Sequence, residues 1–321
     1  MVLPISRRLD FSEIPVIDIG PLIDGNATQV ERSVAALGKA CSDIGFIYIR
    51  NHGVSAALVT HMVEQAKLFF AQPIDEKMRI LLDQRMRGYL PLNYRSYEGE
   101  ARAGTSHQEG FWIGHERSLS TEDPLVGPNQ WPARLPSLKP TMLEYFAAVE
   151  ALSHVLQRGF ALALGLAPDF FQALFRAPNS RLKLNHYPPQ EAPEADNDIG
   201  VVPHSDSGGF TILWQDESGG LEVQSKNGEW VGAPPIEDTF VINLGNVMQI
   251  WTNGRFSSTP HRVINRFGRD RYSVPLFVNP ASSVRIAPLI GAAAEEFVPF
   301  RYGDYQRDEW RRIFPVAKIP A

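Results

Sequence analysis

Two histidines and one aspartate in this sequence have the types and the spacing of a metal site. His204 and Asp206 are separated by one residue, and His261 follows much later in the chain. In a β-strand, residues two apart point to the same face, so His204 and Asp206 can reach one ion from one strand. Two imidazoles and one carboxylate are the set that holds Fe(II) with open coordination positions, although zinc also accepts such a set. We therefore predict a metal site in which His261 comes from a second strand.

A cation and a hydroxyl follow the second histidine. Arg271 and Ser273 lie two apart in the strand-like run RDRYSVPLFV, so both face the same way. A guanidinium binds a carboxylate through two parallel N–H donors, and a seryl hydroxyl can donate another hydrogen bond. If this face lines the interior, Arg271 is a buried cation that needs an anionic partner. We expect these two residues to hold the carboxylate of a co-substrate that chelates the metal.

Segments along nearly the whole chain resemble one family of enzymes. They are IPVIDIGPL from Ile14, GFIYIRNHGV from Gly45, RGYLPL from Arg87, HQEGFWIG from His107, LNHYPPQ from Leu184, HSDSGGFTILWQD, GGLEVQ, VINLGNVMQIWTNGRFSSTPHRVIN and RYSVPLFVNP. In this order they resemble the non-haem Fe(II), 2-oxoglutarate-dependent oxygenases of the isopenicillin N synthase-like family. Where that family often has Gly-Asp, this chain has Gly245-Asn246, at a position that is not a ligand.

The resemblance implies a role for each residue of the site. Three residues would bind Fe(II) and four would contact 2-oxoglutarate, namely His204, Asp206 and His261 for the metal and Arg271, Ser273, Asn185 and Tyr187 for the co-substrate. His186 alternates to the opposite face of its strand, so we expect it outside the site. The implied reaction consumes O2 and 2-oxoglutarate, releases succinate and CO2, and most simply hydroxylates a small organic molecule.

The substrate pocket is expected at the open side of the iron. In the family, the segments equivalent to Arg-Gly-Tyr and Glu-Gly-Phe lie there, and Phe210 follows the His-x-Asp turn. The candidate substrate residues are Arg87, Tyr89, Phe111 and Phe210. The same stretch also contains Tyr94, Arg95 and Arg102. Arg87 or Arg102 could bind an acidic group on the substrate, and the other interpretation is a solvated loop with ordinary charges.

Three functions are compatible with these residues. The first is the 2-oxoglutarate-dependent oxygenase, of which an ethylene- and succinate-forming enzyme would be a variant. The second is a 2-oxoglutarate-independent oxidase of the isopenicillin N synthase type, in which Arg271, Ser273 and Tyr187 would hold a substrate carboxylate instead. The penicillin-forming enzyme ends in Gln-Thr, whereas this sequence ends FPVAKIPA, which favours the first function. The third is a jelly-roll binding protein without turnover, and the intact triad favours an enzyme.

Composition restricts the class of protein. Lys and Arg number 31 against 36 Asp and Glu, and no basic block stands out, so nucleic acid is not an expected partner. A small-molecule substrate is expected, and no protein partner is evident. The chain has neither a run of about 18 apolar residues nor a signal-peptide segment, so we expect no membrane span and no secretion. The single cysteine, Cys41, suits a reducing compartment, and we expect a cytoplasmic protein.

The period of the apolar residues changes along the chain. Helical spacing at 28–42 and apolar density at 141–164 predict two helices, whereas 87–113 reads as irregular. From Arg181 onward, short runs alternate with Gly, Pro and Asn turns, and we predict strands at KLNHY, FTILW, LEVQ, FVINL, VMQIW and SVPLFV. Such strands predict a mainly β fold with a helical cover, built on a double-stranded β-helix or jelly roll.

We expect residues 1–321 to form a single fold unit. Within it, residues 1–175 would be the N-terminal oxygenase region with helices, 176–285 the jelly-roll core that binds Fe(II) and 2-oxoglutarate, and 286–321 a C-terminal segment. A hydrophobic content of 44% supports a full core, and single β-rich domains of this length occur.

Overall fold

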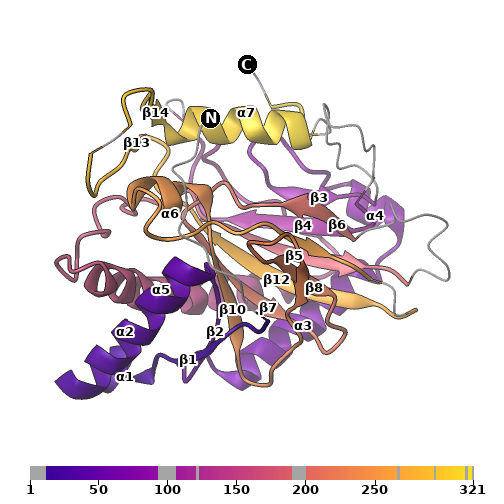
Figure 1. Ribbon diagram of the computed structural model, residues 1–321. Coiled ribbons are helices and arrows are strands. Elements are labelled where there is room, and N and C mark those ends of the chain that lie inside the picture. The colour runs from indigo at the N-terminus through magenta and orange to yellow at the C-terminus, as the bar shows by residue number, and fades with distance from the viewer. Residues whose placement is uncertain are drawn as a thin grey trace.

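The protein is described by a computed structural model that covers residues 12–92, 106–120, 123–189, 200–265, 268–292, 294–314 and 317–319 (Figure 1). Tyr94, Arg95 and Arg102 of the expected substrate segment lie outside these residues. Two β-sheets, one of eight strands and one of four, form the centre of the described molecule.

The eight-stranded sheet has the order β1-β2-β10-β7-β12-β5-β4-β3. Its strands, in that order, are Val16–Asp18, Phe46–Arg50, Phe240–Leu244, Phe210–Gln215, Arg271–Val278, Arg181–Tyr187, Glu109–Gly114 and Gly88–Leu90. β1 and β2 pair in parallel, and the other pairs are antiparallel. Segments from both halves of the chain therefore lie side by side in one sheet.

The four-stranded sheet has the order β6-β11-β8-β9. Its strands are Val201–His204, His261–Val263, Leu221–Gln224 and Trp230–Gly232. A small hairpin of β13 (Arg285–Ile286) and β14 (Phe300–Arg301) lies apart from both sheets. Buried side chains from the eight-stranded and the four-stranded sheet, among them Phe46 of β2, Tyr187 of β5 and Val263 of β11, pack in one cluster. The two sheets thus face each other as the layers of a jelly roll, which confirms the predicted fold class.

Helices flank the sheets. They are α1 (Gly20–Asp24), α2 (Ala27–Asp43), α3 (Ala56–Phe70), α4 (Ile74–Met78), α5 (Leu138–Ala163), α6 (Asn246–Trp251) and α7 (Tyr302–Ile313). The helices α2, α3 and α5 cover the other face of the large sheet, whereas α7 crosses the top of the view (Figure 1). The long helix α5 packs against α2, α3 and β12. Its buried apolar residues join those of the strands in the largest core cluster, because a helix with one apolar face must cover an apolar sheet face. No helix in the described part of the chain has the length and apolarity that crossing a membrane requires.

Two local predictions are wrong. The run VMQIW, predicted as a strand, belongs to α6, whose residues are all buried. A short apolar run does not show by its period whether it is a buried strand or a buried helix. The segment 87–113, predicted as irregular, contains β3 and the start of β4, and both strands are wholly buried.

Candidate active site

The two histidines of the predicted triad lie opposite each other on neighbouring strands. His204 ends β6 and His261 begins β11, and they are register partners in the antiparallel pair. Asp206 follows in the loop that leads from β6 of the small sheet to β7 of the large sheet. The topology therefore brings together residues that are far apart in the sequence, at the point where the chain passes between the sheets.

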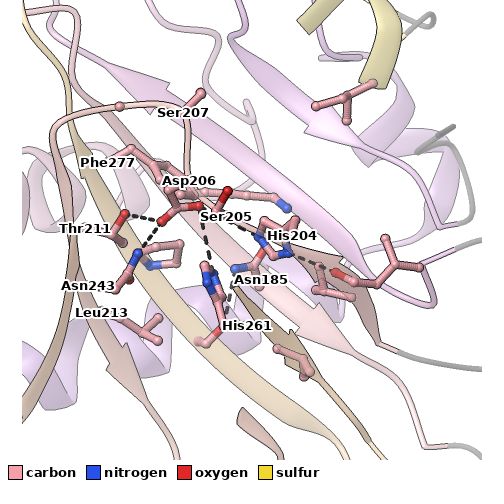
Figure 2. Close-up of a pocket in the computed structure, with 18 of the residues that line it drawn as sticks. Asn185, His204, Ser205, Asp206, Ser207, Thr211, Leu213, Asn243, His261 and Phe277 are labelled. Carbon is pink, nitrogen blue, oxygen red and sulfur yellow. Dashed lines mark hydrogen bonds and ion pairs between the residues drawn. The ribbon is translucent and has the colours of Figure 1, made fainter. Parts of the chain in front are cut away.

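The side chains of these three residues converge. One ligand atom from each of His204, Asp206 and His261 lies within 4.8 Å of the others. The Oδ1 atom of Asp206 is 3.8 Å from Nε2 of His204 and 3.9 Å from Nε2 of His261. Figure 2 shows the carboxylate above the two rings, with all three pointing toward one another. This spacing is that of ligands around one ion rather than of direct hydrogen bonds.

Backbone carbonyls orient both imidazoles. Nδ1 of His204 lies 2.9 Å from the carbonyl oxygen of Val202, and Nδ1 of His261 lies 3.2 Å from that of Thr259. A carbonyl only accepts, so each Nδ1 carries the hydrogen and each Nε2 presents its lone pair. In both histidines, Nε2 is the nitrogen that faces Asp206. With the hydrogen on Nδ1, the lone pair of Nε2 is free to bind a metal ion at this place.

Asp206 is oriented by hydrogen bonds to its second oxygen. Oδ2 accepts from the Thr211 hydroxyl at 2.5 Å and from Nδ2 of Asn243 at 2.7 Å, while Oδ1 faces the histidines (Figure 2). Burial raises the pKa of this carboxyl, but His261, His204 and the two hydrogen bonds outweigh it and lower the pKa below its ordinary value. Asp206 therefore remains an anion, and its Oδ1 atom, which accepts neither of these hydrogen bonds, can bind a cation.

The loop that carries Asp206 is fixed by the start of α6. The backbone N–H of Asn246 donates to the carbonyl of Asp206 at 2.8 Å, and that of Val247 to the carbonyl of Gly208 at 3.0 Å. A Cβ on Gly245 would come within 2.3 Å of the Gly208 oxygen, so only glycine allows this approach. Asn246, which differs from the family's usual Asp, contributes here through its backbone and leaves the triad intact.

A divalent cation fits this set of donors. The triad offers two neutral nitrogen lone pairs and one anionic oxygen, all held by neighbouring groups before any ion arrives. Ligands held in this way by hydrogen bonds to their outer atoms are typical of metal sites. Because the ligands come from one side, an ion bound there keeps positions open for other ligands.

A buried cation lies on β12 in the same cavity. Arg271 is 1% exposed, its guanidinium carbon lies 4.7 Å from the centre of the Tyr187 ring, and its Nε–H donates to the carbonyl of Gly219. Nη2 has only a 3.5 Å contact with Gln215, and Nη1 has no hydrogen-bond partner in the described part of the chain. The structure thus holds a buried guanidinium with N–H groups that lack an acceptor, as an anion-binding site would.

The two other predicted co-substrate residues lie beside Arg271. In the antiparallel pair of β5 and β12, Tyr187 is opposite Arg271 and Asn185 is opposite Ser273. Nδ2 of Asn185 donates to the Ser273 hydroxyl at 3.2 Å, and Oδ1 of Asn185 has no partner among the described residues. All four side chains are buried and border one cavity.

That cavity, of about 820 Å³, lies between the two sheets. The triad, Arg271 and Ser273 line it, and so do residues that the sequence had not singled out. These come from the stretch leading into β4, from β4, β5 and β12, and from α7, which crosses the top of Figure 1. Among them are Gln108, Trp112, Lys183, Phe277, Trp310 and Phe314. Gln108, Trp112 and Phe277 lie within the family-like segments HQEGFWIG and RYSVPLFVNP, where alternation along a strand could have identified them, whereas Trp310 and Phe314 carry no motif.

Three of the four expected substrate residues lie elsewhere. Arg87 donates to the carbonyl of Arg85 at 2.8 Å beneath Gly114, and the Tyr89 hydroxyl donates to Glu109. Phe111 faces the helical layer, where its ring lies 4.6 Å from that of Phe69. None of the three borders the cavity, so their positions do not support the predicted substrate contact. Phe210 does border it, although its ring also packs on Phe160 and Phe175.

His186 lies on the opposite face of β5, as its alternation predicted. Its Nδ1 is 2.7 Å from Glu109 and its Nε2 is 2.7 Å from Asp270. Glu109 also accepts from Lys77 at 2.8 Å. Burial raises the pKa of Glu109, but its hydrogen bonds from His186, Lys77 and Tyr89 lower the pKa below its ordinary value. This buried ionic cluster supports β4 and β5 from behind, where it is separated from the cavity by the sheet.

Known proteins share both the sequence and the fold. The profile of the 2OG-Fe(II) oxygenase superfamily matches residues 178–280, and a profile described as "non-haem dioxygenase in morphine synthesis N-terminal" matches residues 14–134. The 2-oxoglutarate-Fe(II) type oxidoreductase hxnY of Emericella nidulans is 32% identical, over 95% of this chain and 91% of the relative. The 2-oxoglutarate-dependent dioxygenase citB of Monascus ruber is 35% identical, over 89% and 90%.

The solved structures agree. A full-length protein of Neurospora crassa, in complex with alpha-KG and thymine, superposes with a TM-score of 0.83 at 28% identity, covering 92% of this chain and 96% of the Neurospora chain. The predicted use of Fe(II), 2-oxoglutarate and O2 is confirmed by these relatives together with the triad. The oxidase without 2-oxoglutarate is not favoured, because the relatives named here use that co-substrate. The chain belongs to the 2OG-Fe(II) oxygenase superfamily and is a non-haem Fe(II), 2-oxoglutarate-dependent dioxygenase.

Proposed function

We propose that this dioxygenase hydroxylates a small organic molecule in the cavity between its sheets, with each step placed by the residues described above. The metal would be bound by His204, Asp206 and His261. The far carboxylate of 2-oxoglutarate would be bound by Arg271 and Ser273, with Asn185 and Tyr187 beside it. The observation that carries this assignment is the buried Arg271 guanidinium, whose Nη1 has no partner among the described residues and which borders the same cavity as the triad.

The overall reaction balances with these components. One oxygen atom of O2 enters a C–H bond of the substrate, and the other enters the succinate formed when 2-oxoglutarate loses CO2. Two electrons come from the C–H bond and two from 2-oxoglutarate, which together reduce O2. Fe(II), when bound, supplies the activation of O2 that no amino-acid side chain can supply.

The residues of the chain supply position and shielding. Arg271 fixes one end of 2-oxoglutarate by a two-pronged, charge-assisted pair, and Ser273 can donate to the same carboxylate. The Tyr187 ring covers the guanidinium and, with Phe46 and Val263, keeps this end of the cavity apolar. A low-dielectric surrounding strengthens the ion pair, since water would screen it. The substrate would occupy the remaining space, toward β4 and α7.

The decisive test is an anaerobic titration of the protein with Fe(II) and then 2-oxoglutarate. We expect a weak visible charge-transfer band when 2-oxoglutarate chelates the metal. His204→Ala, Asp206→Ala and His261→Ala are each expected to lose bound iron and the band, because each removes one of only three protein ligands. A variant that keeps wild-type iron content would show that the substituted residue is not a ligand.

Turnover is tested separately from binding. With O2 present, succinate and CO2 should form in equal amounts from 2-oxoglutarate, and a substrate found by screening should gain one oxygen atom. A product formed with no loss of 2-oxoglutarate would support the oxidase of the isopenicillin N synthase type instead. The single fold unit and the cytoplasmic location stay predictions, the latter motivated by the single cysteine, Cys41, which is buried and unpaired.

A further inference from the structure

The cavity has a second polar end beyond the proposed 2-oxoglutarate site. The residues of β5 that face the cavity are Tyr187, Asn185 and Lys183. At the rise of an extended strand, Lys183 lies about 13 Å from Tyr187 along β5. The co-substrate residues occupy the first part of this face, so Lys183 marks the part that is left for the substrate.

Buried donors gather at this end. The Lys183 ammonium, in a residue 3% exposed, donates to Oε1 of Gln108 at 3.2 Å. An ammonium only donates, so the amide oxygen must face it and Nε2 must point away. Nε2 of Gln108 and Nε1 of Trp112 are buried without a hydrogen-bond partner in the described part of the chain. These two buried N–H groups face the cavity end without an acceptor, which is unfavourable unless a ligand supplies one.

The strands make room for this arrangement. Trp112 of β4 is the register partner of Lys183, and the ammonium lies 5.2 Å from the centre of its ring. Gly110, between Gln108 and Trp112 on the cavity face, leaves the space that the lysine crosses, since a Cβ there would lie 2.6 Å from Cε of Lys183. The side chain of Lys183 therefore passes over Gly110 of β4 to reach Gln108.

Flat rings surround the same end. The Trp112 ring is stacked on Phe277 of β12, with ring centres 5.7 Å apart at 18°. From α7 and the residue after it, Trp310 and Phe314 meet Trp112 edge-on at 6.3 and 5.5 Å. Aromatic walls of this kind bind a planar, apolar body through stacking and edge contacts.

We infer that Lys183, Gln108 and Trp112 bind an anionic oxygen of the substrate, a carboxylate on a planar ring that lies against the aromatic walls. A carboxylate offers two acceptor oxygens to donors that lack acceptors, and its charge matches the ammonium. This assignment rests on the proposed function, because it takes the other end of the cavity as the place of 2-oxoglutarate. Lys183 would then bind the carboxylate of the substrate, as Arg271 would bind the far carboxylate of 2-oxoglutarate.

The test measures binding without turnover. Protein loaded with Fe(II) and 2-oxoglutarate under argon is titrated by calorimetry with phenylacetate, cinnamate and 2-naphthoate, and with the neutral amide of each. We expect at least one acid to bind about tenfold or more tightly than its amide, since a charge-assisted hydrogen bond is worth about that much. Lys183→Met should remove this preference, whereas Lys226→Met, which removes the same charge from an exposed position, should keep it.

A second variant tests the donor of Gln108. Gln108→Glu has nearly the same shape and replaces the Nε2 donor by a carboxylate oxygen at the same place, so it should abolish acid binding and leave the affinity for 2-oxoglutarate unchanged. The inference is overturned if no acid binds, if the amides bind as well as the acids, or if Lys183→Met keeps the preference. A failure of the proposed function appears earlier in the same titration, as a wild-type protein that does not bind 2-oxoglutarate.

Discussion

Replacing Arg271 should weaken 2-oxoglutarate binding and, at the same time, stabilise the ligand-free protein. The Nε–H group is used by Gly219, so Nη1 and Nη2 are the groups that can meet a carboxylate. Two charge-assisted bonds at about 1.5–3 kcal/mol each, with about 1.4 kcal/mol per tenfold, give a loss of roughly one hundred- to ten-thousandfold for Arg271→Met. Arg271→Lys should recover only part of it, because an ammonium cannot form the two-pronged pair.

The stability effect has the opposite sign. No ion pair in the described residues neutralises Arg271, and a buried charge without a counter-ion is unfavourable by several kcal/mol. Its replacement by methionine, of similar length, should therefore raise the melting temperature of the ligand-free protein, by about 1.5 °C for each kcal/mol gained in a chain of this length. Wild type should be stabilised by 2-oxoglutarate at one hundred times its Kd by about 2.7 kcal/mol, and the variant at the same concentration should gain almost nothing.

The assay is calorimetric titration of 2-oxoglutarate into anaerobic protein, combined with thermal unfolding with and without the ligand. Arg269→Met is the matched control, since Arg269 is exposed and lies two residues before Arg271. A loss smaller than tenfold in Arg271→Met, or an Arg271→Lys variant equal to wild type, would refute the assignment. Equal losses in Arg269→Met would show that net charge, not the buried guanidinium, determines the affinity.

Three further outcomes concern the surroundings of Asp206 and the buried Glu109 cluster behind the sheet. Asn243→Leu, which removes one of the two hydrogen bonds to the ligand carboxylate, should lower Fe(II) affinity roughly ten- to hundredfold, measured by competition with a chelator. Gly245→Ala should also lower Fe(II) affinity, because its Cβ would displace the Gly208 carbonyl, whereas Gly232→Ala, with open space around it, should bind iron normally. Glu109 has a lowered pKa, so its stabilisation is present above its ordinary pKa of 4.5 and is lost as the pH falls through the lower folded value. Glu109→Gln should therefore be less stable at pH 7 and lose less stability on acidification below 4.5, and parallel urea midpoints for both proteins would contradict this.

Strand alternation predicted much of the site because it needs no knowledge of the partner strand. It placed Asn185 and Tyr187 on one face of β5, and Arg271 and Ser273 on one face of β12. The register of β5 against β12, which sets these pairs opposite each other, comes from long-range pairing that no local pattern encodes. The groups that orient the rings of His204 and His261 are likewise backbone carbonyls, which have no signature in a sequence.

Tyr89 and Phe111 lie away from the cavity because they occupy the opposite faces of their strands. The sequence of 87–113 shows no clear period, so it does not indicate which residues of β4 share a face, and in the structure Trp112 rather than Phe111 borders the cavity. A shift of one residue in a strand exchanges the buried faces. The sequence does not indicate that Trp310 and Phe314 line the cavity, because they carry no motif and long-range packing alone brings α7 to the cavity. The divisions of the chain at residues 175 and 285 stay predictions.

The pairing of His204 with His261 makes the metal a cross-link as well as a reaction centre. β6 is an edge strand, joined to β11 by only two register pairs, with an irregularity between them. An ion held by both histidines would join this weak edge to the rest of the small sheet, and because the ligands come together only in the folded chain, its binding free energy would add to the stability of the fold. Loss of iron would then weaken the attachment of β6, the strand that ends in His204, to the rest of the small sheet.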